Sequence, residues 1–129
     1  MNKKAEMKRA SFIHTEDGDD LIVSFAIRGD EPDDPEGVKS LTLIRTPGFE
    51  SLLPDEERGV TVSYDDFPDD EYDLLTGIVL KNQCFTIRTQ NHEYTVNVQH
   101  VDDEELKEAI RILKKMRFDD RFDIRIVQP

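Results

Sequence analysis

Carboxylate side chains are the most abundant groups in this sequence that could do chemistry, with 29 Asp and Glu among 129 residues. Two carboxyl groups held roughly 5–10 Å apart in a cleft could act as a general acid and a general base. No spacing marks such a pair here, and solvated loop charge explains the clusters better. The clusters fall at 16–20, 30–36, 55–57, 65–73 and 119–123. The sequence therefore predicts no catalytic carboxylate.

The acidic segments could also hold a metal ion. The segment 16–20 surrounds Gly18, but it lacks the twelve-residue ligand spacing of an EF-hand, and a β-turn explains the glycine. The three histidines lie at no zinc-ligand spacing, and Cys84 is the single cysteine. We therefore predict neither a metal site nor a cofactor.

His14 and Cys84 come nearest to base or nucleophile chemistry. His14 falls on the expected apolar face of a strand, where a partly buried, hydrogen-bonded histidine is commoner than a general base. Cys84 lies in an expected strand, with no helix N-terminus or histidine nearby to lower its pKa. The sequence also lacks a glycine-rich phosphate loop and a nucleophile elbow. We therefore expect a protein that is not an enzyme.

The net charge of −12 is unevenly distributed. Residues 1–9 hold four bases and one acid, whereas residues 10–100 hold 20 acids and six bases. Such a surface repels the phosphates of nucleic acids and of anionic membranes, and it attracts basic proteins. We therefore expect a basic protein as the partner, with no nucleic acid and no membrane.

The chain has the features of a cytoplasmic protein. A single cysteine excludes an intrachain disulfide, and residues 1–10 lack the apolar run of a secretory signal. No stretch approaches the roughly 20 apolar residues that cross a bilayer. We predict a basic mobile arm at 1–10 and one domain at 11–129, located in the cytoplasm.

Alternating apolar residues predict antiparallel strands. Asp17-Gly18 is a two-residue hairpin signal, and a turn there would place Phe12 opposite Val23 and His14 on the same apolar face. Further strands are expected at 39–46 and 60–64, in a three-stranded meander over 76–99, and at 122–126. Turns at Asn82-Gln83 and Asn91-His92 would give the meander one apolar face and one wet face.

Residues 102–117 predict the one long helix. Asp102 is a good N-cap, and Glu105 is placed to complete a capping box. The apolar stripe comprises Leu106, Ala109, Ile110, Leu113 and Met116. The fold class is therefore α+β, an antiparallel sheet of about six to seven strands with this helix on one face, followed by a last strand. A curled, barrel-like sheet fits the same pattern.

Two surfaces remain for recognition. One is the acidic segment 65–73, which carries two aromatic residues, and the other is the neutral to basic wet face of the meander, which Arg121 and Arg125 would extend. The residues predicted to contact a partner are Asp65, Asp66, Phe67, Asp69, Asp70, Glu71, Tyr72, Arg88 and Asn97.

These features favour a non-catalytic, acidic interaction domain that binds a basic protein. One concrete form is an inhibitor of the immunity or antitoxin type that blocks a cationic toxin. Two alternatives stay open. A small enzyme or small-molecule-binding domain would use a cleft between helix and sheet, and a homodimeric structural or regulatory subunit would join through an uncovered strand edge.

Overall fold

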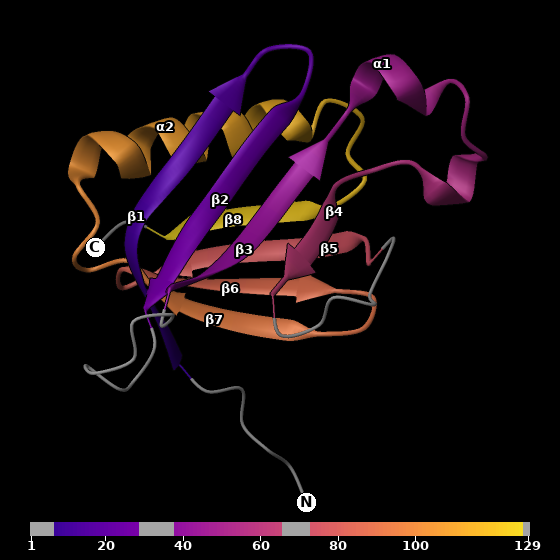
Figure 1. The fold of residues 1–129 in the computed structure, drawn as a ribbon. Helices are drawn as coiled ribbons and strands as arrows, with labels where there is room; N and C mark the ends of the chain where they lie inside the picture. Colours follow the sequence, from indigo (N-terminus) through magenta and orange to yellow (C-terminus); the bar gives the residue numbers. More distant parts are fainter. Residues whose placement is uncertain (1–6, 29–37, 66–72, 128–129) are drawn as a thin grey trace, which may run out of the picture.

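A computed structural model describes residues 7–28, 38–65 and 73–127 and has an α+β fold (Figure 1). Its strands are β1 Met7–Asp17, β2 Leu21–Arg28, β3 Val38–Arg45, β4 Thr61–Tyr64, β5 Leu75–Lys81, β6 Cys84–Thr89, β7 Glu93–Asn97 and β8 Asp123–Val127. Its helices are α1 Pro47–Glu50, the short 3₁₀ helix η1 Asp55–Glu57, and α2 Asp103–Met116. The predicted class is confirmed, with one main helix near the C-terminus and a final strand after it.

The strands form one mixed, open sheet in the order β4-β3-β2-β1-β7-β6-β5-β8. Most neighbours are antiparallel, but β1 pairs with β7 and β5 pairs with β8 in parallel. Residues 7–10, which the sequence assigns to a basic arm, instead begin β1, and Met7–Arg9 pair with Thr95–Asn97 of β7. The two halves of the chain thus join into one eight-stranded sheet.

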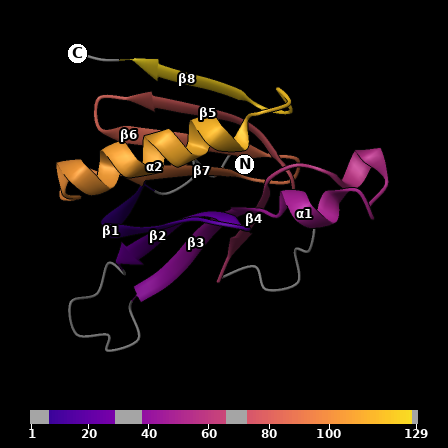
Figure 2. The same ribbon diagram turned by 90° about the horizontal axis from the view of Figure 1, so that it is seen from above.

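The sheet curls so that β1–β4 face β5–β8 across the core, with α2 lying between the two halves (Figure 2). Phe25 of β2 meets Phe85 of β6 edge to face, with the ring centroids 5.4 Å apart. Tyr64 of β4 meets Tyr94 of β7 in the same way, at 5.7 Å. Neither pair of strands is adjacent in the sheet, so these contacts confirm the curled arrangement.

Helix α2 begins at its predicted N-cap, because the Asp102 carboxylate accepts a hydrogen bond from the Glu104 backbone N–H at 3.1 Å. Glu105, which was predicted to complete a capping box, instead accepts a hydrogen bond from the Ile13 N–H of β1 at 2.8 Å. Its most buried side chains are Ala109, Ile112, Leu113 and Met116. Leu106 and Ile110 of the predicted stripe are only partly buried. The predicted stripe does not include Ile112. A helix that packs between two halves of a sheet buries a face whose centre differs slightly from the centre of the apolar stripe in its sequence.

The register predicted for the first hairpin is wrong. Asp17 lies opposite Leu21, so the loop contains three residues, and Phe12 faces Ala26. Ala26 is three positions from the predicted partner, Val23, and a shift by an odd number of residues turns the side chains of a strand to the opposite face. Phe12 is therefore 51% exposed, and the side chain of His14 is 62% exposed.

Strand β1 differs from the prediction in a second way, because it contains a β-bulge between Ala10 and Phe12. The extra residue lets Ala10 and Ile13, three positions apart, both point into the core. Gly18 has no positive φ, so the type I′ turn predicted at Asp17-Gly18 does not form. The turn predicted at Asn82-Gln83 is left-handed, with φ angles of 52° and 61°.

The meander is largely as predicted. Leu80 lies opposite Phe85, which confirms the turn at Asn82-Gln83. In the next pair Phe85 lies opposite Val96, two residues away from the predicted partner. A shift of two residues keeps every side chain on its face, so the prediction of one apolar and one wet face is correct.

Candidate interaction surfaces

Two acidic segments attach at the same end of the sheet. The Ser40 backbone N–H near the start of β3 donates to the Asp65 carboxylate at 2.9 Å, and the Asp65 N–H donates to the Ser40 carbonyl at 3.3 Å. Arg28 and Val38, which flank segment 29–37, are also paired. Arg28, Val38 and Asp65, three of the four described residues that border segments 29–37 and 66–72, thus lie at one end of the sheet. Asp73, the fourth, lies beside Val62 of β4 instead. The two segments contain nine acidic residues and no basic residue.

Most of the predicted partner contacts belong to the second acidic segment. Asp66, Phe67, Asp69, Asp70, Glu71 and Tyr72 lie outside the described residues. Asp65 is described and exposed at the end of β4. Its hydrogen bonds with Ser40 give it a structural role as well, because they join the ends of β3 and β4.

Asp73, the last residue of the acidic segment, has a structural role and is completely buried. Its carboxylate accepts hydrogen bonds from the Thr89 hydroxyl at 2.7 Å and from the Asn91 backbone N–H at 3.0 Å. Its carbonyl accepts from the Val62 N–H of β4 at 2.8 Å. Asp73 therefore ties the β6–β7 turn to β4. The apolar pair that follows it in the sequence, Leu74-Leu75, was the available signal for its burial.

Arg88 and Asn97 lie on the outer face of the meander, as predicted, but they are not adjacent. Arg88 pairs with Glu93 at 3.1 Å, and both side chains are more than half exposed. Asn97 lies opposite Cys84, four positions from Glu93 along β7, which is about 13 Å of strand. The two residues therefore do not make a single contact point.

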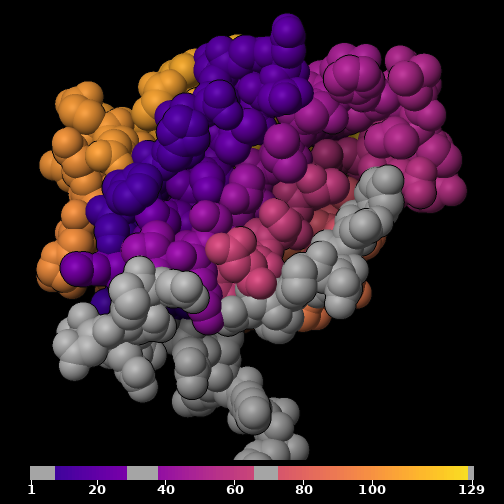
Figure 3. Space-filling model, viewed as in Figure 1, coloured from indigo at the N-terminus to yellow at the C-terminus, as the bar shows by residue number. Residues whose placement is uncertain are grey.

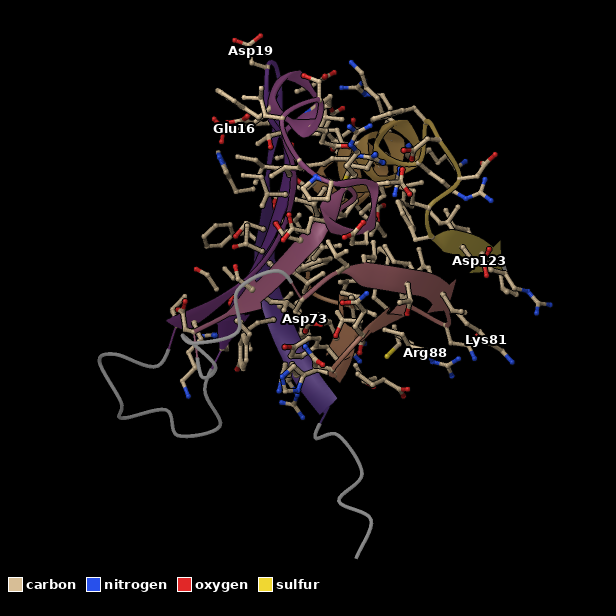
Figure 4. All side chains as sticks on the ribbon, turned by 90° about the vertical axis from the view of Figure 1, so that its right-hand side faces the viewer. Glu16, Asp19, Asp73, Lys81, Arg88 and Asp123 are labelled. Carbon is tan, nitrogen blue, oxygen red and sulfur yellow. The ribbon has the colours of Figure 1, made fainter. Side chains whose placement is uncertain are left out.

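The outer face is basic where β5 and β8 extend it. Arg125 of β8 lies beside Val79 of β5, on the same face as Thr86 and Thr95, as predicted. Lys81 and Arg88 also project from this face, with Asp123 at its margin (Figure 4). Arg121 was predicted to join this face, but its guanidinium binds Asp119 and Asp55, each at 2.6 Å.

His14 and Cys84, the candidates for base and nucleophile chemistry, lie in β1 and β6. His14 lies 3.9 Å from Glu16 on the exposed face, so its predicted partial burial is wrong. Cys84 is partly buried, and this burial raises the pKa of its thiol. A raised pKa disfavours the reactive thiolate, in agreement with the structural role predicted for this cysteine.

The sequence analysis missed an arginine at the centre of a buried ion-pair network. The side chain of Arg45, at the end of β3, is 0% exposed. Its guanidinium donates to both carboxylate oxygens of Glu50 in α1, at 2.7 and 2.8 Å, and to both of Asp119, at 2.7 Å each. It also donates to the Met116 carbonyl at 2.7 Å. All five N–H donors of the guanidinium therefore have an acceptor.

Burial alone would lower the pKa of Arg45, but its hydrogen bonds to Glu50 and Asp119 outweigh this and raise it. The Arg45 hydrogen bonds lower the pKa of Asp119 to about 2 against the opposing effect of burial, and Arg121 lowers it further. Both groups are therefore charged at neutral pH. The available sequence signal was the alternation of Leu41, Leu43 and Arg45, which places the arginine on the inward face of β3.

Three large apolar side chains are exposed around this network. Two of them belong to the segment of α1 and η1, which forms the magenta end of the molecule in Figure 3. Phe118 covers the Arg45 guanidinium, with the guanidinium carbon 3.9 Å from its ring centroid, and is itself 59% exposed. Phe49 and Leu52 flank Glu50 and are 66% and 79% exposed. Exposed apolar groups held by a fixed network are suited to partner contacts, so this is a third candidate surface.

The described residues contain no group of three His, Cys, Asp or Glu side chains that could hold a metal ion. An open hollow of about 400 Å³ lies at the β1–β2 turn and is lined by residues 16–20. Within the described ranges, no helix combines the length and the apolar character needed to cross a membrane. The chain matches no protein-family model, no curated protein and no solved structure.

Proposed function

We propose that this chain is a non-catalytic interaction domain that binds a basic protein through the end of the sheet where the two acidic segments attach. The observation that carries the proposal is the pair of hydrogen bonds between Ser40 and Asp65. They place Asp65, where segment 66–72 begins, beside the start of β3, which follows segment 29–37. Both segments, which contain nine carboxylates in all, therefore begin from residues at this end of the sheet.

Concentrated charge of one sign speeds the approach of a partner of opposite sign. The described residues carry a smaller share of the net charge, because most of their acids are balanced by Lys and Arg. The two acidic segments contain no such balance. The attraction to a basic protein is therefore strongest at this end of the sheet.

The attachment points of the segments are firmly held. Asp73 is buried and hydrogen-bonded to the β6–β7 turn, and Asp65 is bonded to β3. Fixed ends reduce the conformational entropy that the segments lose when they bind. Phe67 and Tyr72 supply aromatic groups of the kind that anchor interfaces.

The test compares two variants of equal charge. The loop variant carries Asp66→Asn, Asp69→Asn, Asp70→Asn and Glu71→Gln. The control variant carries Asp19→Asn, Asp20→Asn, Glu56→Gln and Glu57→Gln, at the opposite end of β2 and β3. Each loses four negative charges. The wild-type chain and both variants are used as bait in extracts of the organism that makes the chain, and the retained proteins are identified by mass spectrometry.

The expected result is a basic protein retained by the wild type and the control but lost by the loop variant. With that protein purified, the association rate should fall about tenfold or more in the loop variant at low salt, and little in the control. Retention of no basic protein, or equal losses in both variants, would reject the proposal.

The finer form of the proposal is an inhibitor of the immunity or antitoxin type. Its support is the small size and strong acidity of the chain, which suit an inhibitor that binds a cationic protein one to one. It predicts that the retained partner is toxic when expressed alone and that co-expression of the chain restores growth. Growth arrest that the chain does not relieve would leave the interaction domain but exclude the inhibitor.

A further inference from the structure

Helix α2 covers the part of the β1 edge that does not pair with β7. Met7–Arg9 of β1 pair with β7, and no strand within residues 7–28, 38–65 and 73–127 lies beside the rest of this edge. Helix α2 lies along it, where Glu105 accepts a hydrogen bond from the Ile13 backbone N–H at 2.8 Å. Lys115 and Arg111 bind the Asp17 carboxylate at 2.6 and 2.9 Å.

The edge of β4 is covered by the chain that leads into β5. The Val62 N–H donates to the Asp73 carbonyl, and the Leu75 N–H donates to the Val60 carbonyl, both at 2.8 Å. Thr61 and Leu74 form an antiparallel bridge at the same place. Two edges of the sheet are thus occupied by groups of the chain itself.

The remaining edge belongs to β8, which pairs with β5 alone. Among residues 7–28, 38–65 and 73–127, no other strand or helix forms backbone hydrogen bonds with β8. It is the outermost strand in the view from above (Figure 2). An uncovered edge strand readily pairs with a strand from another chain.

The exposed side chains of β8 carry opposite charges, which two copies of the strand could match with each other. Asp123 and Arg125 are exposed on the outer face, on either side of Ile124. Ile124 and Ile126 point inward and are only partly buried against the core. We propose that β8 pairs antiparallel with β8 of a second copy of this chain, about a twofold axis at Ile124. This inference is independent of the proposed function.

The charges favour this register over the two with axes at the neighbouring charged residues. In an antiparallel pair, directly opposite residues point to the same side, so outer residues must face outer residues. An axis at Ile124 places Asp123 opposite Arg125 of the second copy, twice. An axis at Asp123 or at Arg125 would instead place like charges opposite each other. The axis at Ile124 also brings the half-exposed isoleucines of the two copies together, which removes apolar surface from water.

The test uses charge reversal in the full chain. Sedimentation equilibrium of the wild type from about 10 to 500 μM should show a monomer–dimer equilibrium. Asp123→Arg gives two bases and Arg125→Asp gives two acids, so each single variant should dimerise about tenfold or more weakly. The double variant D123R/R125D restores opposite charges and should dimerise like the wild type. An equimolar mixture of the two single variants should form a heterodimer.

A wild type that stays monomeric at 500 μM would overturn the proposal. Single variants that dimerise as well as the wild type would also overturn it, as would a double variant that does not recover. Circular dichroism and urea unfolding show whether each single variant is folded. A heterodimer formed on mixing shows in addition that both retain a competent β8.

Discussion

Arg45 and Asp119 lie 74 positions apart and are joined by two hydrogen bonds of 2.7 Å, one from each terminal nitrogen of the guanidinium. Because Arg45 also binds Glu50, the network connects the end of β3, α1 and the segment that follows α2. Arg121 extends it to Asp55 in η1. A single buried cation thus positions the segments that expose Phe49, Leu52 and Phe118.

Replacement of Arg45 should strongly destabilise the protein. Arg45→Met leaves Glu50, which is 8% exposed, without its ionic partner, and such a loss costs about 3–5 kcal/mol. Urea unfolding at pH 7 measures the difference. The triple variant R45M/E50M/D119L removes the charges together and should recover much of the loss. As a control, Arg88→Met breaks only an exposed pair and should change stability by about 1 kcal/mol or less. Similar losses in both arginine variants would contradict this account.

The same network should make stability depend on pH in the acidic range. The pKa of Asp119 is about 2 in the folded protein, below its ordinary value of 3.8. A depressed pKa means that the ionised carboxylate stabilises the fold, fully above about pH 4 and progressively less toward pH 2. Because its side chain is 31% exposed, we expect this group to contribute about 1–2 kcal/mol.

Urea unfolding of the wild type and of Asp119→Asn at pH 6 and pH 2 tests this contribution. Other carboxylates titrate in both proteins, so the informative quantity is the difference between the two pH dependences. The wild type should lose about 1–2 kcal/mol more than the variant. Equal losses would show that the Asp119 carboxylate has no special stabilising role.

Glu105 should stabilise the contact between α2 and the bulged strand β1. Glu105→Ala leaves the Ile13 N–H without its acceptor and should cost about 1–3 kcal/mol. Glu105→Gln retains a carbonyl acceptor and should cost less. Hydrogen exchange at the Ile13 amide should accelerate in the alanine variant alone. Glu104→Ala, at an exposed neighbouring position, is the control, and an equal effect there would contradict the assigned contact.

Elements set by local signals were predictable. The turn at Asn82-Gln83 and the pairing of Leu80 with Phe85 followed from the alternation on either side of a short turn. The start of α2 followed from the Asp102 cap. Both depend on interactions between residues close in sequence, which a single sequence contains.

Features set by distant contacts were not predictable from these patterns. The parallel pairing of Met7–Arg9 with β7 and the Arg45 network join segments more than 70 residues apart. The candidate sites divide in the same way. The outer-face position of Arg88 followed from alternation, whereas the burial of Asp73 depends on Thr89 in another strand.

The first hairpin shows how a local signal can mislead, and it can be tested by mutation. Asp17-Gly18 favours a two-residue turn with Phe12 inside, whereas the structure buries Ile13 at 4% exposure and leaves Phe12 51% exposed. Ile13→Ala should therefore cost about 2–4 kcal/mol, because it leaves a cavity in the core. Phe12→Ser should cost about 1 kcal/mol or less. Urea unfolding of the two variants distinguishes the registers directly, since the two-residue turn predicts the opposite order of stability.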